Sequence, residues 1–247
     1  FSFIINRSRN TDSNTVYIRF IQLTLFNFIQ NCFRDIRNDL LSVILLACRN
    51  LPFLNQSSVC LKQTTFYGCT AMNDLYLHAY LQEIKSGAFG NCTGLSDVTI
   101  PESVTKIEGG AFKNCTGLTD IIYKAADCST VNVSLSSSVF SGCSGAATVS
   151  IGDNVEIIPP YLFCSMPYLN WIAFPESSTK LNEIGAYAFY GCKKLTEITV
   201  PSNVMTIAKG AFANCDSIKY LSLSGTYLTN IGAEAFSGCC ALTEIDI

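Results

Sequence analysis

Histidine is scarce in this sequence, and the common catalytic motifs are missing. The sequence has one histidine, His78, and it contains no G-x-G-x-x-G motif, no P-loop and no nucleophile-elbow motif. Without these parts, neither a catalytic triad nor a phosphate-binding loop can be assembled from recognisable elements. We therefore expect a protein that is not an enzyme, with no cofactor implied.

Long apolar runs are also missing. Hydrophobic residues make up 49% of the chain, yet no stretch of 18 consecutive apolar residues occurs. A membrane-spanning helix needs about 20 such residues. We expect no membrane span in this segment, so the apolar residues must be buried in a core.

Glycine and arginine are distributed unevenly along the chain. No glycine precedes Gly68 and no arginine follows Arg49. Residues 1–65 carry six arginines and one lysine against three aspartates, a net charge of +4, and the remainder carries nine lysines against sixteen acidic residues, a net charge of −7. The negative remainder disfavours nucleic acid as a partner. The composition divides the chain into an atypical segment, residues 1–64, and residues 65–247. Residues 1–64 are interpreted either as a helical cap or as a misread or non-native join.

A nine-residue phrase recurs through residues 65–247. "GAFGNCTGL" begins at Gly87 and "GAFKNCTGL" begins at Gly110, with drifting copies at "YAFYGCKKL", "GAFANCDSI" and "EAFSGCCAL". Aligned on cysteine, the copies are spaced by 23, 23, 28, 21, 28, 23 and 24 residues. A period in this range is typical of a solenoid, in which each copy is one coil that buries its apolar face against its neighbours.

The coil from Leu195 to Cys215 shows how one repeat folds. In "LTEITV" apolar and polar residues alternate, which predicts a half-buried strand that Pro201 ends. Val204 and Ile207 return apolar side chains to the interior. The following "AKGAFANC" predicts a short helical or 3₁₀ turn that packs Phe212 inward. One coil is therefore a strand, a turn, a short return strand and a helical turn.

The coils "LSDVTIPESVTKIEGGAFKNC" and "LTEITVPSNVMTIAKGAFANC" resemble the BspA-like leucine-rich repeat family. The resemblance covers residues 65–247 and implies a β-rich α/β leucine-rich-repeat solenoid of about eight stacked coils. It also implies a strand-lined concave face and display on a microbial surface as an adhesin or interaction module. Because the chain stops at Ile247 in mid-strand, we expect the array to be truncated there. The coil after Lys124 is long and serine-rich, and the coil ending in Cys164 lacks the Ala-Phe pair, so regular curvature is not expected there.

Cysteine is abundant, but its spacing favours neither disulfides nor zinc. No C-x-x-C occurs, and a zinc finger needs ligands that the lone histidine does not supply. A disulfide needs facing Cβ atoms, whereas equivalent residues of stacked coils point the same way. We expect a ladder of small buried thiols at one repeat position, formed by Cys69, Cys92, Cys115, Cys143, Cys164, Cys192, Cys215 and Cys239.

Recognition is left to the outward strand positions. The residue two after each repeat leucine is acidic in five of eight coils, and two others are aromatic: Asp74, Asp97, Asp120, Thr148, Trp171, Glu197, Tyr220 and Glu244. Parallel strands place neighbours about 4.8 Å apart, so Asp74, Asp97 and Asp120 should form a carboxylate row. Such a row is either a solvated face, a surface for a basic protein partner or a calcium site. Trp171, which we place after a two-residue insertion, either belongs to an interface or covers that insertion.

These observations favour a non-catalytic protein-protein interaction module. We expect it to be displayed at the cell surface or secreted, and to bind a host or neighbouring-cell surface protein with a basic patch. The predicted partner-binding residues are Asp74, Asp97, Asp120, Trp171, Glu197, Tyr220 and Glu244. The alternatives are a structural spacer that displays another domain and an intracellular, cytoplasmic scaffold.

Overall fold

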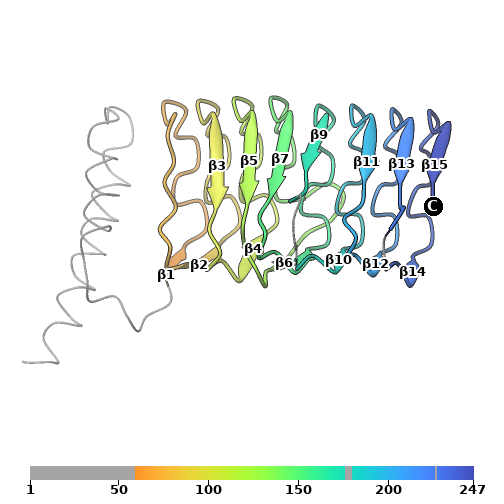
Figure 1. Cartoon of the computed structure of the whole chain (residues 1–247). Coiled ribbons are helices and arrows are strands. Elements are labelled where there is room, and N and C mark those ends of the chain that lie inside the picture. Colours follow the sequence, from red (N-terminus) through yellow and green to blue (C-terminus); the bar gives the residue numbers. More distant parts are fainter. Residues whose placement is uncertain (1–58, 176–179, 226) are drawn as a thin grey trace, which may run out of the picture. The chain divides into compact units, whose positions relative to one another are not determined.

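The computed structural model describes residues 59–175, 180–225 and 227–247 (Figure 1). The N-terminal segment up to residue 58, including its two interpretations, lies outside the described residues. All described residues belong to one unit, Ala47–Ile247. Within it, successive coils stack side by side, as the repeat period predicts (Figure 1).

Each regular coil contributes its first strand to one face, called here the first-strand face. All strands on this face are parallel to their neighbours. The face consists of two sheets in the order β3 (Asp97–Ile100), β5 (Asp120–Tyr123), β7 (Thr148–Ile151), β9 (Trp171–Ala173) and β11 (Glu197–Thr199), β13 (Tyr220–Ser222), β15 (Glu244–Asp246).

The return strands form a second-strand face, again as two parallel sheets. One contains β1 (Val59–Leu61), β2 (Leu81–Ile84), β4 (Lys106–Glu108) and β6 (Ser129–Val131), and the other contains β8 (Ile157–Ile158), β10 (Glu183–Ile184), β12 (Thr206–Ile207) and β14 (Asn230–Ile231). Each face is divided into its two sheets at one place. The second-strand face is divided between β6 and β8, and the first-strand face is divided between β9 and β11. The first of these breaks follows β6, which lies in the long serine-rich coil, where the sequence gives no expectation of regular curvature.

The strands follow the alternation expected from the sequence. In β5 the burial pattern is exposed, buried, exposed, buried, and in β11 it is exposed, buried, exposed. Val204, Ile207 and Phe212 are fully buried, and the amide of Val204 donates to the Pro201 carbonyl in the reversing turn. The expectation of inward apolar and outward polar positions is confirmed for this coil.

The expected helical turn has the form of separate hydrogen-bonded turns, and no helix occurs in the described residues. The amides of Ala211, Ala213 and Cys215 donate to the carbonyl three residues back. The intervening amides, those of Gly210, Phe212 and Asn214, donate instead to the next coil. A continuous helix would need every amide for itself, so coil-to-coil bonding excludes it.

Two side-chain ladders fill the interior. Phenylalanine rings of successive coils stack with centroids 5.0 Å apart for Phe89 and Phe112 and 5.1 Å apart for Phe112 and Phe140. Beside the rings, the buried thiols of Cys92, Cys115 and others donate hydrogen bonds to backbone carbonyls of the preceding coil. Every cysteine in the described part of the chain is a free thiol.

One position of the predicted cysteine ladder is wrong. Met166, not Cys164, occupies the ladder position, because Tyr161 and Ser165 adopt the positive φ angles that precede Ala88 and Cys92 in the regular coil. Leu162 and Phe163 consequently take the Ala-Phe positions, so the coil keeps the phenylalanine and has leucine in place of the alanine. The amide of Leu169 donates to the Met166 carbonyl as that of Leu95 donates to the Cys92 carbonyl.

This correction also removes the proposed insertion before Trp171. With Met166 in the ladder, the spacings on either side become 23 and 26 residues. Trp171 follows Leu169 by two positions, as Asp97 follows Leu95. Trp171 therefore lies in the regular outward row and does not cover an insertion.

Candidate interaction surface

The outward row of the first-strand face begins with two paired carboxylates. Asp97 of β3 is the register partner of Asp120 in β5, and Asp120 is the partner of Thr148 in β7. Thr148 in turn pairs with Trp171 in β9. Asp74, the third acid of the expected row, is exposed but lies outside any strand. Four consecutive coils therefore present Asp97, Asp120, Thr148 and Trp171 side by side in one sheet.

Hydrogen bonds hold both carboxylates in place, and those to Asp120 also favour its charged form. Ser96 Oγ donates to Asp97 Oδ2 over 3.0 Å, and Thr119 Oγ1 donates to Asp120 Oδ2 over 2.7 Å. The hydroxyl of Thr148 also donates to Asp120. The hydrogen bonds from Thr148 and then Thr119 lower the pKa of Asp120 below its ordinary value. Asp120 is thus a fixed negative charge beside Thr148 at neutral pH.

An aromatic surface continues the row. Trp171 is 49% exposed, although tryptophan side chains are on average largely buried in folded proteins. Ile122, two residues after Asp120 on the same face of β5, is 38% exposed. Trp171 and Ile122 thus form exposed apolar surface beside the two carboxylates, a composition that is frequent at interface centres.

The remaining predicted residues lie on the other sheet of the same face. Glu197 of β11 pairs with Tyr220 of β13, which pairs with Glu244 of β15. Glu197 and Glu244 are exposed and Tyr220 is half-buried between them. Because β9 and β11 belong to different sheets, the structure groups the seven predicted residues into two sets and not into one row.

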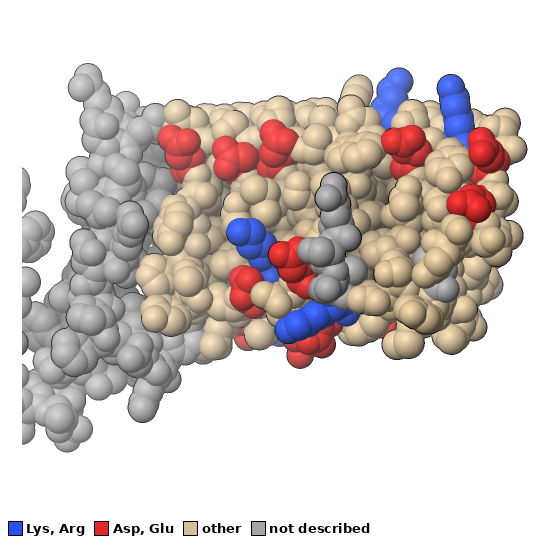
Figure 2. Space-filling model, in the orientation of Figure 1, with Lys and Arg blue, Asp and Glu red and all other residues tan. Residues whose placement is uncertain are grey.

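The two sets differ in charge. Figure 2 shows acidic side chains along the upper edge at the N-terminal half of the array, and lysines join them only at the C-terminal half. Lys193 pairs with Asp216 at 3.6 Å, and exposed Lys219 directly precedes Tyr220. The purely acidic part of the first-strand face is therefore the sheet of β3, β5, β7 and β9.

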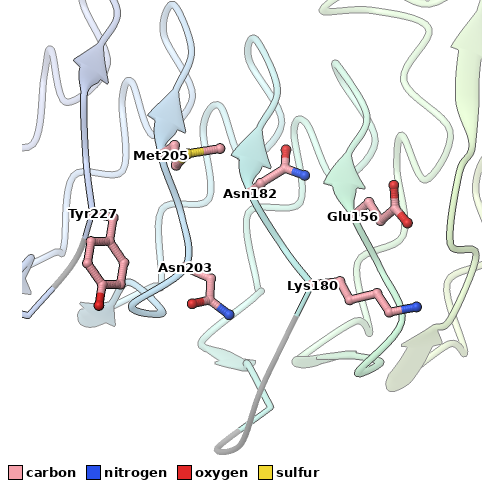
Figure 3. Close-up of a pocket in the computed structure, with 6 residues that line it drawn as sticks. All are labelled: Glu156, Lys180, Asn182, Asn203, Met205 and Tyr227. Atoms are coloured by element: carbon pink, nitrogen blue, oxygen red, sulfur yellow. The ribbon is translucent and has the colours of Figure 1, made fainter.

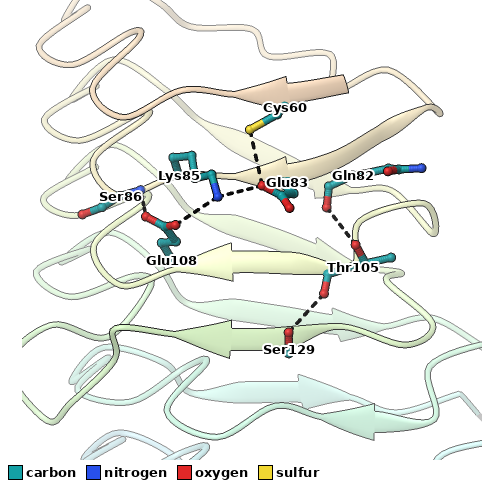
Figure 4. Close-up of polar contacts among 8 residues, drawn as sticks. All are labelled: Cys60, Gln82, Glu83, Lys85, Ser86, Thr105, Glu108 and Ser129. Atoms are coloured by element: carbon teal, nitrogen blue, oxygen red, sulfur yellow. Dashed lines mark hydrogen bonds and ion pairs between the residues drawn. The ribbon is translucent and has the colours of Figure 1, made fainter. Parts of the chain in front are cut away.

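Two carboxylates on the second-strand face, those of Glu83 and Glu108, are already occupied (Figure 4). Lys85 Nζ lies 2.7 Å from Glu83 Oε2 and 3.2 Å from Glu108 Oε1. Glu108 also accepts the Ser86 amide over 3.0 Å, and Cys60 Sγ donates to Glu83. The bond from Lys85 is the main cause that lowers the pKa of Glu83. This cluster links neighbouring coils and leaves little net charge for a partner.

The described residues contain neither a metal-binding cluster nor a membrane-spanning helix. No group of three or more His, Cys, Asp and Glu side chains is placed to hold a metal ion there. Over the same residues, no helix has the length and apolarity needed to cross a bilayer.

The sequence analysis missed one hollow, next to the second-strand face. Its lining residues come from four neighbouring coils whose equivalent positions are 23 to 26 residues apart in sequence, so no local motif marks it. The available signal is the series of longer side chains Glu156, Asn182 and Met205 at an outward position where the two preceding coils have Thr105 and Ser129.

Known proteins support the repeat architecture. The model of the BspA type leucine-rich repeat region matches residues 48–134 and 133–247 in six copies. No curated protein matches the chain. A leucine-rich repeat protein from Bacteroides ovatus is 24% identical with a TM-score of 0.60, over 76% of this chain and 52% of its own.

Two further solved structures match. A leucine-rich repeat protein from Eubacterium ventriosum is 20% identical with a TM-score of 0.56, over 74% of this chain and 46% of its own. A leucine rich cell surface protein from Faecalibacterium prausnitzii is 20% identical with a TM-score of 0.42, over 78% and 71%. The chain spans about half the length of the Bacteroides ovatus and Eubacterium ventriosum proteins. With the family model covering most of the sequence, the chain belongs to the BspA-type leucine-rich repeat family.

Proposed function

We propose that this array is a non-catalytic binding module whose first-strand face captures a basic patch on a protein of a host or neighbouring cell. The single observation that carries the proposal is the exposed Trp171 in register with Thr148 and Asp120 in one sheet. Surface display is the expectation that comes with the family resemblance and belongs to the same proposal.

The acidic sheet favours a cationic partner for two reasons. Asp97 and Asp120 lie about 4.8 Å apart across parallel strands, so one arginine guanidinium can reach both carboxylates. Bringing a cation between them also relieves their mutual repulsion of about 0.9 kcal/mol in water. No lysine or arginine lies in β3, β5, β7 or β9 to compete for these groups.

The aromatic end of the sheet supplies the second part of the contact. Trp171 is one strand from Thr148 and two from Asp120, and Ile122 continues the apolar area. A tryptophan ring binds a neighbouring cation through its face and contributes a large desolvated area. The arrangement combines charge, which raises association rates, with an apolar anchor, which slows dissociation.

The test compares the full chain with the variant Asp97→Asn, Asp120→Asn, Trp171→Ala, Tyr220→Ala. Both are immobilised and exposed to biotin-labelled surface proteins of candidate partner cells, and captured proteins are then tested singly. A matched variant carries Gln82→Ala, Thr105→Ala and Ser129→Ala on the second-strand side. We expect capture by the wild type and the matched variant and its loss in the quadruple variant.

Salt provides an independent readout. Because the contact is electrostatic, capture should weaken as the salt concentration is raised toward about 1 M, where the Debye length falls to about 3 Å. If the same proteins bind the quadruple variant, or if only array length affects adhesion, the spacer interpretation replaces this one.

A further inference from the structure

A hollow of about 430 Å³ opens beside β8, β10 and β12 (Figure 3). It is lined by Glu156, Lys180, Asn182, Asn203, Met205 and Tyr227. The volume lies within the range of about 300 to 1,000 Å³ that is usual for small-ligand sites. It is separate from the first-strand face, so its role is independent of the proposed function.

The lining residues form two rows of three (Figure 3). Glu156, Asn182 and Met205 are equivalent positions, because the Asn182 amide donates to the Glu156 carbonyl and the Met205 amide donates to the Asn182 carbonyl. The first row continues at Thr229 in the next coil. The second row lies two residues earlier in each coil and consists of Lys180 before Asn182, Asn203 before Met205 and Tyr227 before Thr229. Residues two apart on an extended chain share a face, so the backbone ladder fixes both rows.

The N-terminal half of the array has a different surface at the same positions. There the first row continues as Gln82, Thr105 and Ser129, linked by hydroxyl-to-carbonyl bonds of 3.3 Å (Figure 4). The second row has exposed Tyr80 and the shorter Ser103. The coil of Tyr80 and Gln82 also has a ring and a long polar side chain, but the next two coils carry the shorter Thr105 and Ser129 in the first row. Among the described coils, long side chains therefore follow one another over several coils only at the hollow.

The side chains around the hollow combine apolar surface with planar polar groups. Tyr227 is 71% exposed and Met205 is 48% exposed, which gives an aromatic face and a flexible apolar contact. Asn182, Asn203 and Glu156 supply amide and carboxylate groups, and Lys180 supplies an ammonium group. The lining holds one negative and one positive charge, so neither an anion nor a cation is favoured overall.

We propose that this hollow binds a neutral saccharide. A pyranose ring carries C–H groups of slight positive charge on its face and hydroxyl groups on its rim. The face fits against the electron-rich tyrosine ring, and the hydroxyl groups both donate and accept, as amide and carboxylate groups require. A charged ligand would be attracted by one of the two charged residues, Glu156 and Lys180, and repelled by the other.

The exposure of the lining side chains to water limits the affinity that we expect. Polar groups that keep contact with water contribute little each, so a single disaccharide should bind with a dissociation constant of about a millimolar. Useful attachment to a glycan-coated surface would then come from many copies acting together.

Saturation-transfer NMR on the full 247-residue chain tests the proposal. The probes are lactose, maltose, cellobiose and N,N′-diacetylchitobiose, with sialyllactose as a charged comparison. We expect at least one neutral disaccharide to bind, and Tyr227→Ala to weaken it at least about tenfold, which corresponds to about 1.4 kcal/mol. Tyr80→Ala, at the equivalent position two residues before Gln82, should leave binding unchanged.

A second variant guards against an indirect effect of the tyrosine. Asn182→Leu keeps the side-chain size but removes the amide, and it too should weaken binding while thermal unfolding of each variant reports its fold. The proposal is overturned if none of the four neutral probes binds, if only sialyllactose binds, or if Tyr227→Ala binds as the wild type does. Equal loss in Tyr80→Ala would also overturn it, because binding would then lie elsewhere. Retained sugar binding in the quadruple variant of the first-strand face would separate this result from the fate of the proposed function.

Discussion

The Sγ atom of Cys115 lies 3.1 Å from the carbonyl oxygen of Phe89 in the preceding coil. The same bond joins Cys92 to Phe66, Cys143 to Phe112, Cys192 to Phe163 and Cys215 to Phe189. Cysteine suits this position because it is small and apolar yet still has a proton to donate. The thiol ladder therefore ties coil to coil beside the phenylalanine stack.

Removing one thiol should weaken this tie. Cys115→Ala leaves a small cavity and takes the donor from the buried Phe89 carbonyl, so we expect a loss of about 1–3 kcal/mol in unfolding free energy. Urea denaturation followed by circular dichroism measures it. Cys240→Ala, at an exposed cysteine, is the matched control and should be near neutral. An equal effect of both would contradict a structural role for the ladder.

Alkaline pH should act on the same ladder. The interaction with the Cys143 thiol, together with burial, raises the pKa of Cys115 from 9.0 to about 12. The folded state therefore holds this proton more tightly than the unfolded chain does, and the stabilisation is complete below pH 9 and is lost as pH rises toward 12. Unfolding measured across this pH range should show the decline. A profile that Cys115→Ala leaves unchanged would count against this assignment.

The phenylalanine stack should be the larger contributor. Phe112 is fully buried between the rings of Phe89 and Phe140. Phe112→Ala is expected to cost about 3–5 kcal/mol, since it removes a large apolar side chain and both ring contacts. Thermal unfolding measures the loss, and Tyr168→Ala, at an exposed aromatic residue, serves as the control. A small effect at Phe112 would mean that the coils are loosely packed.

Two glycines in the turns separate backbone strain from steric contact. Gly142 and Gly191 have φ angles of +78° and +72°, which disfavour any side chain. A Cβ atom at Gly142 would lie 2.2 Å from Asn114 Oδ1, whereas at Gly191 it would meet nothing within 4 Å. We expect Gly191→Ala to cost about 1 kcal/mol and Gly142→Ala distinctly more. Equal losses in urea titrations would show that Asn114 moves away freely.

Charge on the first-strand face should depend on Thr148. Its hydroxyl is the main cause of the lowered pKa of Asp120, so Thr148→Val should raise that pKa toward the ordinary 3.8. The sign follows because a bond to the charged carboxylate favours ionisation. Carbon-detected NMR titration of the Asp120 side chain measures the change, with Thr99→Val as a control on the same face. No movement of the titration midpoint would remove Thr148 from the account of this carboxylate.

The sequence was sufficient to predict the repeat and to predict which side chains face inward. Alternation in "LTEITV" and the spacing of Val204, Ile207 and Phe212 depend only on the local geometry of an extended chain and its turns. The register of Asp97 with Asp120 followed from the same period, because parallel coils of equal length align equivalent residues. Burial and pairing of these elements were therefore predictable.

Other features were decided only by contacts between coils. Cys164 and Met166 are both acceptable in a buried ladder, and the backbone angles at Tyr161 and Ser165 select Met166. The Phe212 amide has two possible acceptors, and the neighbouring coil provides the one that excludes a helix. Likewise, the hollow at Tyr227 exists because four coils place unlike side chains next to each other. Local sequence determines the direction of each side chain, but hydrogen-bond partners and cavities belong to pairs of coils, so tertiary structure determines them.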